Sequence, residues 1–134
     1  FLDLMRKTTQ VVILSDTFRQ FAGPAMARLG YPTLFCNDLV ADEEGRLIDY
    51  RLRQQDGKRH AVLAFRSMNL RVLAAGDSYN DLSMIQEADY GAFFRPPKRI
   101  LQEHPELPAF SDYTPFAEAL TEAVQRLEAM PLKM

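Results

Sequence analysis

Two apolar segments of this chain end abruptly in small and acidic residues that could bind a phosphate group and a metal ion. The first is the run 11–17, Val-Val-Ile-Leu-Ser-Asp-Thr, and the second is the run 73–81, Leu-Ala-Ala-Gly-Asp-Ser-Tyr-Asn-Asp, with Lys58 between them. In an open α/β sheet, ligands bind just beyond the carboxyl ends of the strands. A hydroxyl, an ammonium group and two carboxylates would gather there. That combination is the chemistry of a phosphate-and-metal site.

In the first segment, Ser15 is predicted to end a strand and to open a helix. Its hydroxyl and the neighbouring backbone N–H groups, including that of Asp16, could hold a phosphate, because helix N-termini offer unpaired donors and a positive dipole end. The alternative is that Ser15 only caps the helix. Taken alone, this motif does not separate the two interpretations.

Lys58 follows a predicted turn at residues 55–57 and comes just before a predicted helix. A cation at a helix N-terminus opposes the helix dipole, so an anionic partner such as phosphate is favoured there. The alternative is an ordinary solvated lysine on the surface.

In the second segment, Asp77 and Asp81 bracket a short loop that contains Asn80. Two carboxylates on one tight loop repel each other unless a cation or a proton lies between them. Mg²⁺ binds one or two carboxylates together with waters and phosphate oxygens, and this spacing suits it. Gly76 allows the backbone to turn directly at the strand end, and the Asn80 amide could donate to a phosphate oxygen. The alternative is an acidic turn in which the helix dipole stabilises Asp81.

The composition indicates a soluble globular domain that binds neither nucleic acid nor membranes. The 134 residues are 47% hydrophobic and 25% charged, and the net charge of -2 leaves no basic surface for nucleic acid or anionic lipid. No apolar run approaches the roughly 20 residues that a membrane helix needs. The lone Cys36 cannot form an internal disulfide, so a cytoplasmic location is expected.

Alternating strands and helices predict a mostly parallel sheet that is covered on both faces. The β-branched and apolar runs predict strands over residues 11–14, 34–40, 47–52, 71–75 and 91–94. The predicted helices cover residues 18–29, 59–68 and 80–88, a short segment near residue 100, and residues 114–130. The second and third strands should form an antiparallel hairpin through the turn at residues 42–45.

Three details of the helices are also predicted. The first of the long helices should bury Phe18, Phe21, Met26 and Leu29 and end at Gly30. Gly23-Pro24 should kink or divide that helix. The last helix should begin with Thr114 as its N-cap and Pro115 in the first helical position.

These motifs resemble those of the haloacid-dehalogenase-like (HAD) phosphohydrolase superfamily. The run 12–17 is similar to its second motif, Lys58 to its third, and the run 76–81 to its fourth. The wider run, including Ser15-Asp-Thr-Phe, Tyr31-Pro-Thr-Leu, Tyr50-Arg-Leu-Arg-Gln and the residues around Asp77, is similar to the branch of bifunctional phosphoserine phosphatases and homoserine phosphotransferases. The similarity covers roughly residues 1 to 120. It implies a Rossmann-like three-layer α/β sandwich.

The resemblance also implies roles for individual residues. Ser15, the backbone amide of Asp16, Lys58 and Asn80 would bind the phosphate, and Asp77 would be a Mg²⁺ ligand. Asp81 would orient metal-bound water or hold Lys58, and Lys58 and Asp81 would take part in catalysis. In this family an aspartate attacks phosphorus and forms an aspartyl-phosphate, which water or an acceptor hydroxyl then resolves.

One family motif is missing, however. The Asp-x-Asp pair that supplies the nucleophile has no counterpart before Val11, because Asp3 lies in a helical segment without a second aspartate two residues on. The helical cap between that motif and residue 1 is missing as well. Residues 1–134 are therefore expected to be the C-terminal part of such a domain, inactive alone, with an open slot between the first strand and the strand at Arg71. The two unpaired strand edges would favour instability or association, so a homodimer is compatible with the sequence.

The resulting hypothesis is a Mg²⁺-dependent phosphatase or phosphotransferase that acts on phosphoserine, a small phosphorylated amino acid. One alternative is a non-catalytic interaction or regulatory module that keeps the fold without the chemistry. Another is a HAD phosphatase for a different small phosphorylated metabolite, because the cap that sets specificity is missing. Fold analogy alone does not separate these alternatives.

Overall fold

The structure, a computed structural model, describes residues 1–131, which form two compact units. One unit comprises residues 2–57, and the other comprises Phe1 and the residues from Lys58 onward. Each unit contributes one three-stranded sheet, and the predicted mostly parallel α/β architecture is confirmed. Among residues 1–131, no helix is long and apolar enough to cross a membrane.

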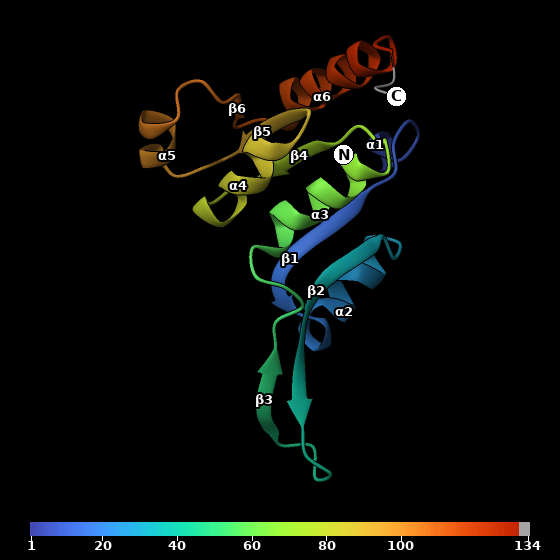
Figure 1. The fold of residues 1–134 in the computed structure, drawn as a ribbon, viewed down its shortest axis with the longest axis vertical. Coiled ribbons are helices and arrows are strands. Elements are labelled where there is room, and N and C mark those ends of the chain that lie inside the picture. The colour runs from blue at the N-terminus through green and yellow to red at the C-terminus, as the bar shows by residue number, and fades with distance from the viewer. Residues whose placement is uncertain (132–134) are drawn as a thin grey trace. The chain divides into compact units, whose positions relative to one another are not determined.

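The sheet of the unit formed by residues 2–57 has the strand order β1-β2-β3 (Figure 1). Its elements are α1 (Leu2–Met5), β1 (Val12–Phe18), α2 (Arg19–Arg28), β2 (Thr33–Ala41) and β3 (Leu47–Arg51). β1 and β2 are parallel, whereas β2 and β3 form an antiparallel hairpin. The predicted hairpin is therefore confirmed. Beyond the end of β1, the Gln20 side chain of α2 bonds to this edge of β2. It accepts the backbone N–H of Leu39 and donates to its C=O, both at 3.1 Å.

Helix α2 differs from its prediction in two respects. Pro24 lies inside the helix without dividing it. The buried residue of the helix is the small Ala22, while Phe21 and Leu29 are 64% and 36% exposed, so the expectation that these two point inward is wrong, and Phe18 belongs to β1 rather than to the helix. The backbone leaves the helix through Gly30 with φ of 72°, the left-handed conformation that glycine adopts easily. The predicted end of the helix is thereby confirmed.

The other unit holds a parallel sheet with the order β4-β5-β6. Its elements are α3 (Gly57–Ser67), β4 (Leu73–Gly76), α4 (Tyr79–Glu87), β5 (Tyr90–Phe94), α5 (Lys98–Glu103), β6 (Ala109–Phe110) and α6 (Tyr113–Glu128). The two-residue strand β6 was not expected, because it is short and the prolines at 105 and 108 precede it. Asp112 occupies the N-cap position of α6, so Thr114 and Pro115 lie in its first turn, and the prediction of Thr114 as N-cap is wrong.

The core of this second unit lies between its sheet and its helices. The side chains with less than 2% exposure are Phe93, Ile85, Ile100 and Val62. Burying each of these side chains contributes roughly 1.5–3 kcal/mol. Phe94, Phe110 and Phe116 stack beside them, with ring centroids 5.0 and 5.7 Å from Phe116. This core fixes β4 and α4, the two elements that flank the acidic loop.

β1 and β4 are edge strands of separate sheets. Among the described residues, β1 pairs only with β2 and β4 pairs only with β5. Each therefore keeps one edge without a strand partner within residues 1–131. Within residues 1–131, β1 and β4 are not paired with each other. The expectation that a further strand belongs between them stays a prediction.

Candidate functional site

The acidic loop after β4 is organised around the buried carboxylate of Asp81, in the first turn of α4. One carboxylate oxygen accepts a hydrogen bond from Lys58 Nζ at 2.8 Å. The other accepts from the backbone N–H groups of Asp77 and Ser78 at 2.9 and 3.1 Å, and from the Ser78 hydroxyl at 3.1 Å. Both oxygens are therefore occupied by protein donors. Asp81 shapes the loop and positions the lysine.

Lys58 lies in the first turn of α3, and its side chain is only 13% exposed against 7% for that of Asp81. It is thus not a solvated surface lysine, and that alternative is excluded. Burial by itself raises the pKa of Asp81. This effect is outweighed by hydrogen bonds from Lys58 and from the N–H groups of Asp77 and Ser78, together with the charge of the lysine. The pKa of Asp81 is therefore lower than its usual value. The Asp81 carboxylate is therefore expected to stay ionised at neutral pH.

The lowered pKa of Asp81 predicts an acid-dependent loss of stability. A carboxyl group with a lower pKa in the folded state contributes stability above its unfolded pKa, about 3.9, and loses it as the pH falls through the folded value. We expect the free energy of unfolding of the natural chain to fall more steeply below about pH 5 than that of an Asp81→Asn variant. Urea unfolding at a series of pH values measures this difference. Equal slopes for the two proteins would contradict it, because all other carboxylates titrate in both.

Gly76, the last residue of β4, leaves the space that Asp81 occupies. A Cβ atom at this position would lie 2.4 Å from Cβ, Cγ and Oδ2 of Asp81, well inside contact distance. The hydrogen bonds to the Asp81 carboxylate hold it in place, so the clash cannot be relieved by a simple rotation. The strand end therefore requires glycine because of this close approach.

We expect Gly76→Ala to lower the free energy of unfolding by about 1–3 kcal/mol, the usual range for an overpacked buried site. It should also displace Asp81 from Lys58. Gly23→Ala is the matched control, because a Cβ there meets nothing within 4 Å. Thermal unfolding followed by circular dichroism compares the two variants, and a Gly76→Ala protein as stable as the control would contradict the argument.

Asp77, on the loop, and Asn80, in the first turn of α4, are both exposed. Their carboxylate and amide are therefore accessible beside the Lys58–Asp81 pair. Within residues 1–131, no group of three or more His, Cys, Asp or Glu side chains could hold a metal ion. Asp77 is a hard oxygen donor of the kind that Mg²⁺ prefers, and Mg²⁺ is commonly bound by one or two carboxylates plus waters and phosphate oxygens. The loop could thus supply one carboxylate ligand for such an ion, Asp77, and the remaining ligands would come from other groups.

Ser15 and Asp16 lie in the other unit, and their local structure differs from the prediction. β1 continues to Phe18, so Ser15 lies within a strand, and the expectation that it opens a helix is wrong. Leu14 pairs with Phe35 and Phe18 pairs with Asn37, so residues 15–17 bulge out of the regular ladder. The Ser15 hydroxyl accepts the backbone N–H of Thr17 at 3.2 Å inside this bulge.

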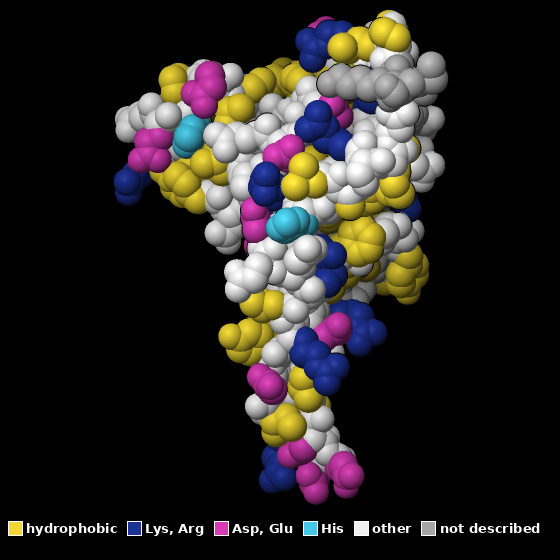
Figure 2. Space-filling view, in the orientation of Figure 1, with side chains coloured by type: hydrophobic (Ala, Val, Ile, Leu, Met, Phe, Trp, Pro, Cys, Tyr) yellow, Lys and Arg dark blue, Asp and Glu magenta, His cyan; other side chains and the backbone are white. Residues whose placement is uncertain are grey.

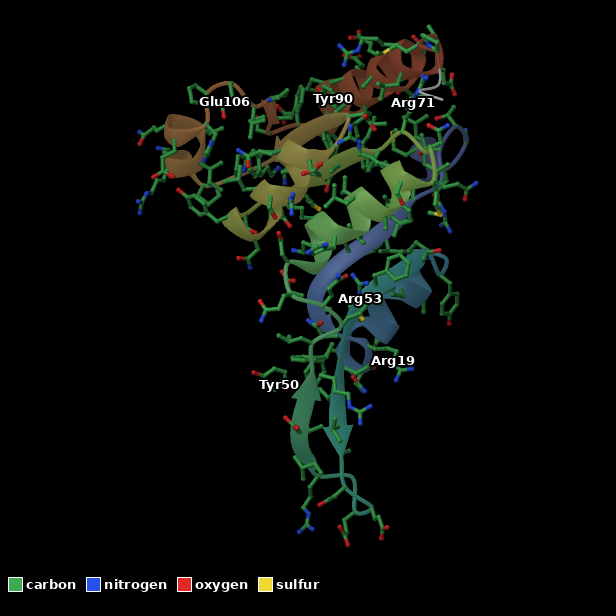
Figure 3. All side chains as sticks on the ribbon, viewed as in Figure 1. Arg19, Tyr50, Arg53, Arg71, Tyr90 and Glu106 are labelled. Atoms are coloured by element: carbon green, nitrogen blue, oxygen red, sulfur yellow. The ribbon has the colours of Figure 1, made fainter. Side chains whose placement is uncertain are left out.

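Asn37 organises this bulge, and sequence reasoning did not identify it. Its side-chain amide donates to the backbone carbonyl of Asp16 at 3.0 Å, and its carbonyl oxygen accepts the backbone N–H of Arg53 at 2.9 Å. The residue is only 9% exposed. Figure 3 labels Arg53 where the chain leaves the hairpin. An amide directly after the apolar residues 34–36, inside the predicted strand 34–40, was the available signal, because buried polar groups need partners.

Two bacterial phosphoserine phosphatases are similar in sequence to almost the whole length of this chain. It is 47% identical over 126 residues to a phosphoserine phosphatase of Pseudomonas syringae pv. tomato, and 46% identical over 126 residues to phosphoserine phosphatase ThrH of Pseudomonas aeruginosa. Each match covers 94% of this chain but only 53% and 62% of the relatives. The chain thus spans little more than half the length of the curated relatives it matches. No family model matches it.

Solved structures show the same fold. A phosphoserine phosphatase in its apo form aligns with a TM-score of 0.68 and 21% identity, over 89% of this chain and 61% of that one. A HAD family hydrolase from Salmonella enterica serovar Typhi aligns with a TM-score of 0.65 and 19% identity, over 81% of this chain and 39% of that one. The fold is therefore HAD-like, and the resemblance predicted from the motifs is confirmed. The partial coverage is consistent with the C-terminal part of such a protein.

Proposed function

We propose that this chain, a homologue of phosphoserine phosphatases with the HAD-like fold, supplies the phosphate-binding and Mg²⁺-binding part of a phosphoserine phosphatase site. The observation that carries the proposal is the buried Lys58–Asp81 pair at the carboxyl end of β4, with Nζ and Oδ1 2.8 Å apart. Ligands bind at such strand ends in open α/β sheets. The exposed Asp77 on the loop and Asn80 in the first turn of α4 would complete this part of the site.

Each residue has a task that its position supports. The Lys58 ammonium, fixed by Asp81, would neutralise a phosphate oxygen, and the Asn80 amide would donate a hydrogen bond to another. Asp77 would be a ligand of Mg²⁺, which when bound would neutralise charge on the phosphate. Ser15 and the N–H of Asp16 would contribute further donors to the phosphate. Phosphoryl transfer depends on this kind of positioning and charge neutralisation more than on a strong base.

The nucleophile would come from outside residues 1–134. No Asp-x-Asp pair precedes β1 in this sequence. An aspartate on a further strand would form the aspartyl-phosphate, and water or the hydroxyl of homoserine would then accept the phosphoryl group. The substrate would be a small phosphorylated amino acid in the cytoplasm, and residues 1–134 alone would not turn it over.

A fusion protein tests this function. The residues that precede the matched stretch in the Pseudomonas aeruginosa relative would be joined to Phe1, and phosphate release from phosphoserine would be measured with Mg²⁺, with and without homoserine. We expect steady turnover by the fusion and none by residues 1–134. Transfer to homoserine would identify the phosphotransferase activity.

Other outcomes would favour the alternatives. A folded fusion that hydrolyses no phosphate ester would contradict the proposal and favour a non-catalytic module. A fusion that hydrolyses sugar phosphates or nucleotides in preference to phosphoserine would indicate a HAD phosphatase for another metabolite. Steady turnover by residues 1–134 alone would show that the nucleophile lies within them.

A further inference from the structure

Helix α3, which carries Lys58 in its first turn, is joined to the end of α4 by a network of charged side chains. Glu87 is the last residue of α4. One oxygen of its carboxylate accepts from Arg59 Nε at 3.2 Å, and the other accepts from Arg66 Nη1 at 3.3 Å. Figure 2 shows basic and acidic side chains side by side over the part of this unit that Figure 1 labels α3, α4 and β5. One carboxylate therefore holds the helix of Lys58 at two points.

Further contacts of Arg66 strengthen this link. Its guanidinium also donates to the backbone C=O of Glu87 at 2.8 Å, one of the last four carbonyls that have no partner within a helix. Asp89, two residues after the end of α4, lies 3.4 Å from Arg66 Nε and accepts the backbone N–H of Val72 at 2.8 Å. A cation is favoured at a helix C-terminus. Arg66 thus anchors α3 to the C-terminal end of α4.

The network sets both the position and the rotation of α3. Arg59 and Arg66 are seven residues apart, about two helical turns, so they lie on one face of the helix. The buried side chains of α3 are short and non-polar and make no directional contact; they are Ala61 and Val62. Lys58 directly precedes Arg59, so the place of its side chain depends on where the two arginines hold the helix.

We propose that Glu87 is a positioning residue for the reaction, because through Arg59 and Arg66 it holds α3 where Lys58 meets the loop after β4. Asp81 fixes the ammonium group itself, at 2.8 Å, and Glu87 fixes the helix from which the lysine extends. Glu87 would contact neither phosphate nor metal and would act through Lys58. The proposal rests on the proposed function only in that Lys58 binds the phosphate.

The chemical reactivity of Lys58 in the natural 134-residue chain tests the positioning independently of catalysis. Reductive methylation with formaldehyde and cyanoborohydride modifies a lysine when its amine is accessible, so the rate at Lys58 reports how often it leaves Asp81. In Glu87→Gln, Lys58 should be modified at least about threefold faster, because loss of a partly buried carboxylate loosens α3 locally. Mass spectrometry of the peptides measures the rate at each lysine, and the exposed Lys98 is the internal reference.

Matched variants separate this local effect from a general loss of structure. Glu128→Gln makes the same change at the exposed last residue of another helix, α6, and should leave the rate at Lys58 unchanged. Arg59→Met should raise that rate, and adding it to Glu87→Gln should have no further effect, because the contact is already lost. Equal rates at Lys58 in the natural chain and in Glu87→Gln would overturn the proposal. So would a rise of the same size at Lys98, which would indicate general unfolding.

Kinetics of the fusion protein connect the position of Lys58 to the reaction. Glu87→Gln should lower kcat/KM for phosphoserine at least about threefold, whereas the Mg²⁺ concentration that gives half the maximal rate should stay the same, because Asp77 is untouched. An unchanged kcat/KM, despite faster modification of Lys58, would overturn the proposal. A fusion that is inactive while Lys58 still responds to Glu87→Gln would contradict the proposed function and support the hold of Glu87 on Lys58.

Discussion

Asp81→Ala is expected to lower the free energy of unfolding of the chain by about 3–5 kcal/mol, the range for breaking a buried ion pair from one side. The Lys58 ammonium would lose the carboxylate 2.8 Å away, and the N–H groups of Asp77 and Ser78 would lose their acceptor. All three hydrogen bonds are part-buried, so water replaces the lost carboxylate oxygen poorly. Chemical denaturation of the purified chain measures the change.

Asp38→Ala is the matched control for this prediction. Asp38 also forms an ion pair, with Arg19 at 2.8 Å, but both side chains are largely exposed. Its loss should therefore cost no more than about 1 kcal/mol. Asp81→Asn, which keeps an oxygen acceptor for the backbone N–H groups, should fall between the two. Equal losses for Asp38→Ala and Asp81→Ala would contradict the central position given to Asp81.

Asp77→Asn should reduce phosphoserine hydrolysis by the fusion protein at least about a hundredfold, the scale of removing one preorganised charge-stabilising group. The proposal makes Asp77 a ligand of Mg²⁺, and a neutral amide oxygen binds such a hard cation more weakly than a carboxylate. The side chain is exposed, so stability should change little. Initial rates over a range of Mg²⁺ concentrations measure the effect, and the dependence on Mg²⁺ should move to higher concentration.

Asp112→Asn serves as the control for Asp77→Asn. Asp112 is an exposed aspartate after β6 in the N-cap position of α6, where asparagine is as favourable as aspartate. Its substitution makes the same chemical change in the same unit and should leave the rate unchanged. If both variants kept the full rate with the same Mg²⁺ dependence, Asp77 would not be a metal ligand.

The local structure of the loop after β4 could be predicted because its signals are local, while its role in binding phosphate and metal stays a prediction. An apolar run that ends in Gly76 and then in acidic residues is short in sequence and self-contained in structure. The loop from Asp77 to Asp81 closes on itself through backbone hydrogen bonds over three or four residues. Only the pairing of Asp81 with Lys58 joins residues far apart in the sequence. It was expected from the resemblance to the HAD motifs and not from a local pattern.

The segment around Ser15 could not be predicted correctly because its structure depends on distant residues. The strand continues past Ser15 because β2 lies alongside it, and Asn37 holds the bulge from 21 residues away. The burial of α2 was misjudged for the same reason. Periodicity alone assigned Phe21 to the core, whereas the helix presents Ala22 to the rest of its unit. Tertiary contacts of this kind leave no pattern in a short window of sequence.

The most direct test of the account is a calorimetric titration of the fusion protein with inorganic phosphate, with and without Mg²⁺. If Lys58, Asp77 and Asn80 form the phosphate-and-metal part of the site, binding should be saturable, should require Mg²⁺, and should be lost in Asp77→Asn but kept in Asp112→Asn. Phosphate binding that is indifferent to Mg²⁺ and to Asp77→Asn would contradict it.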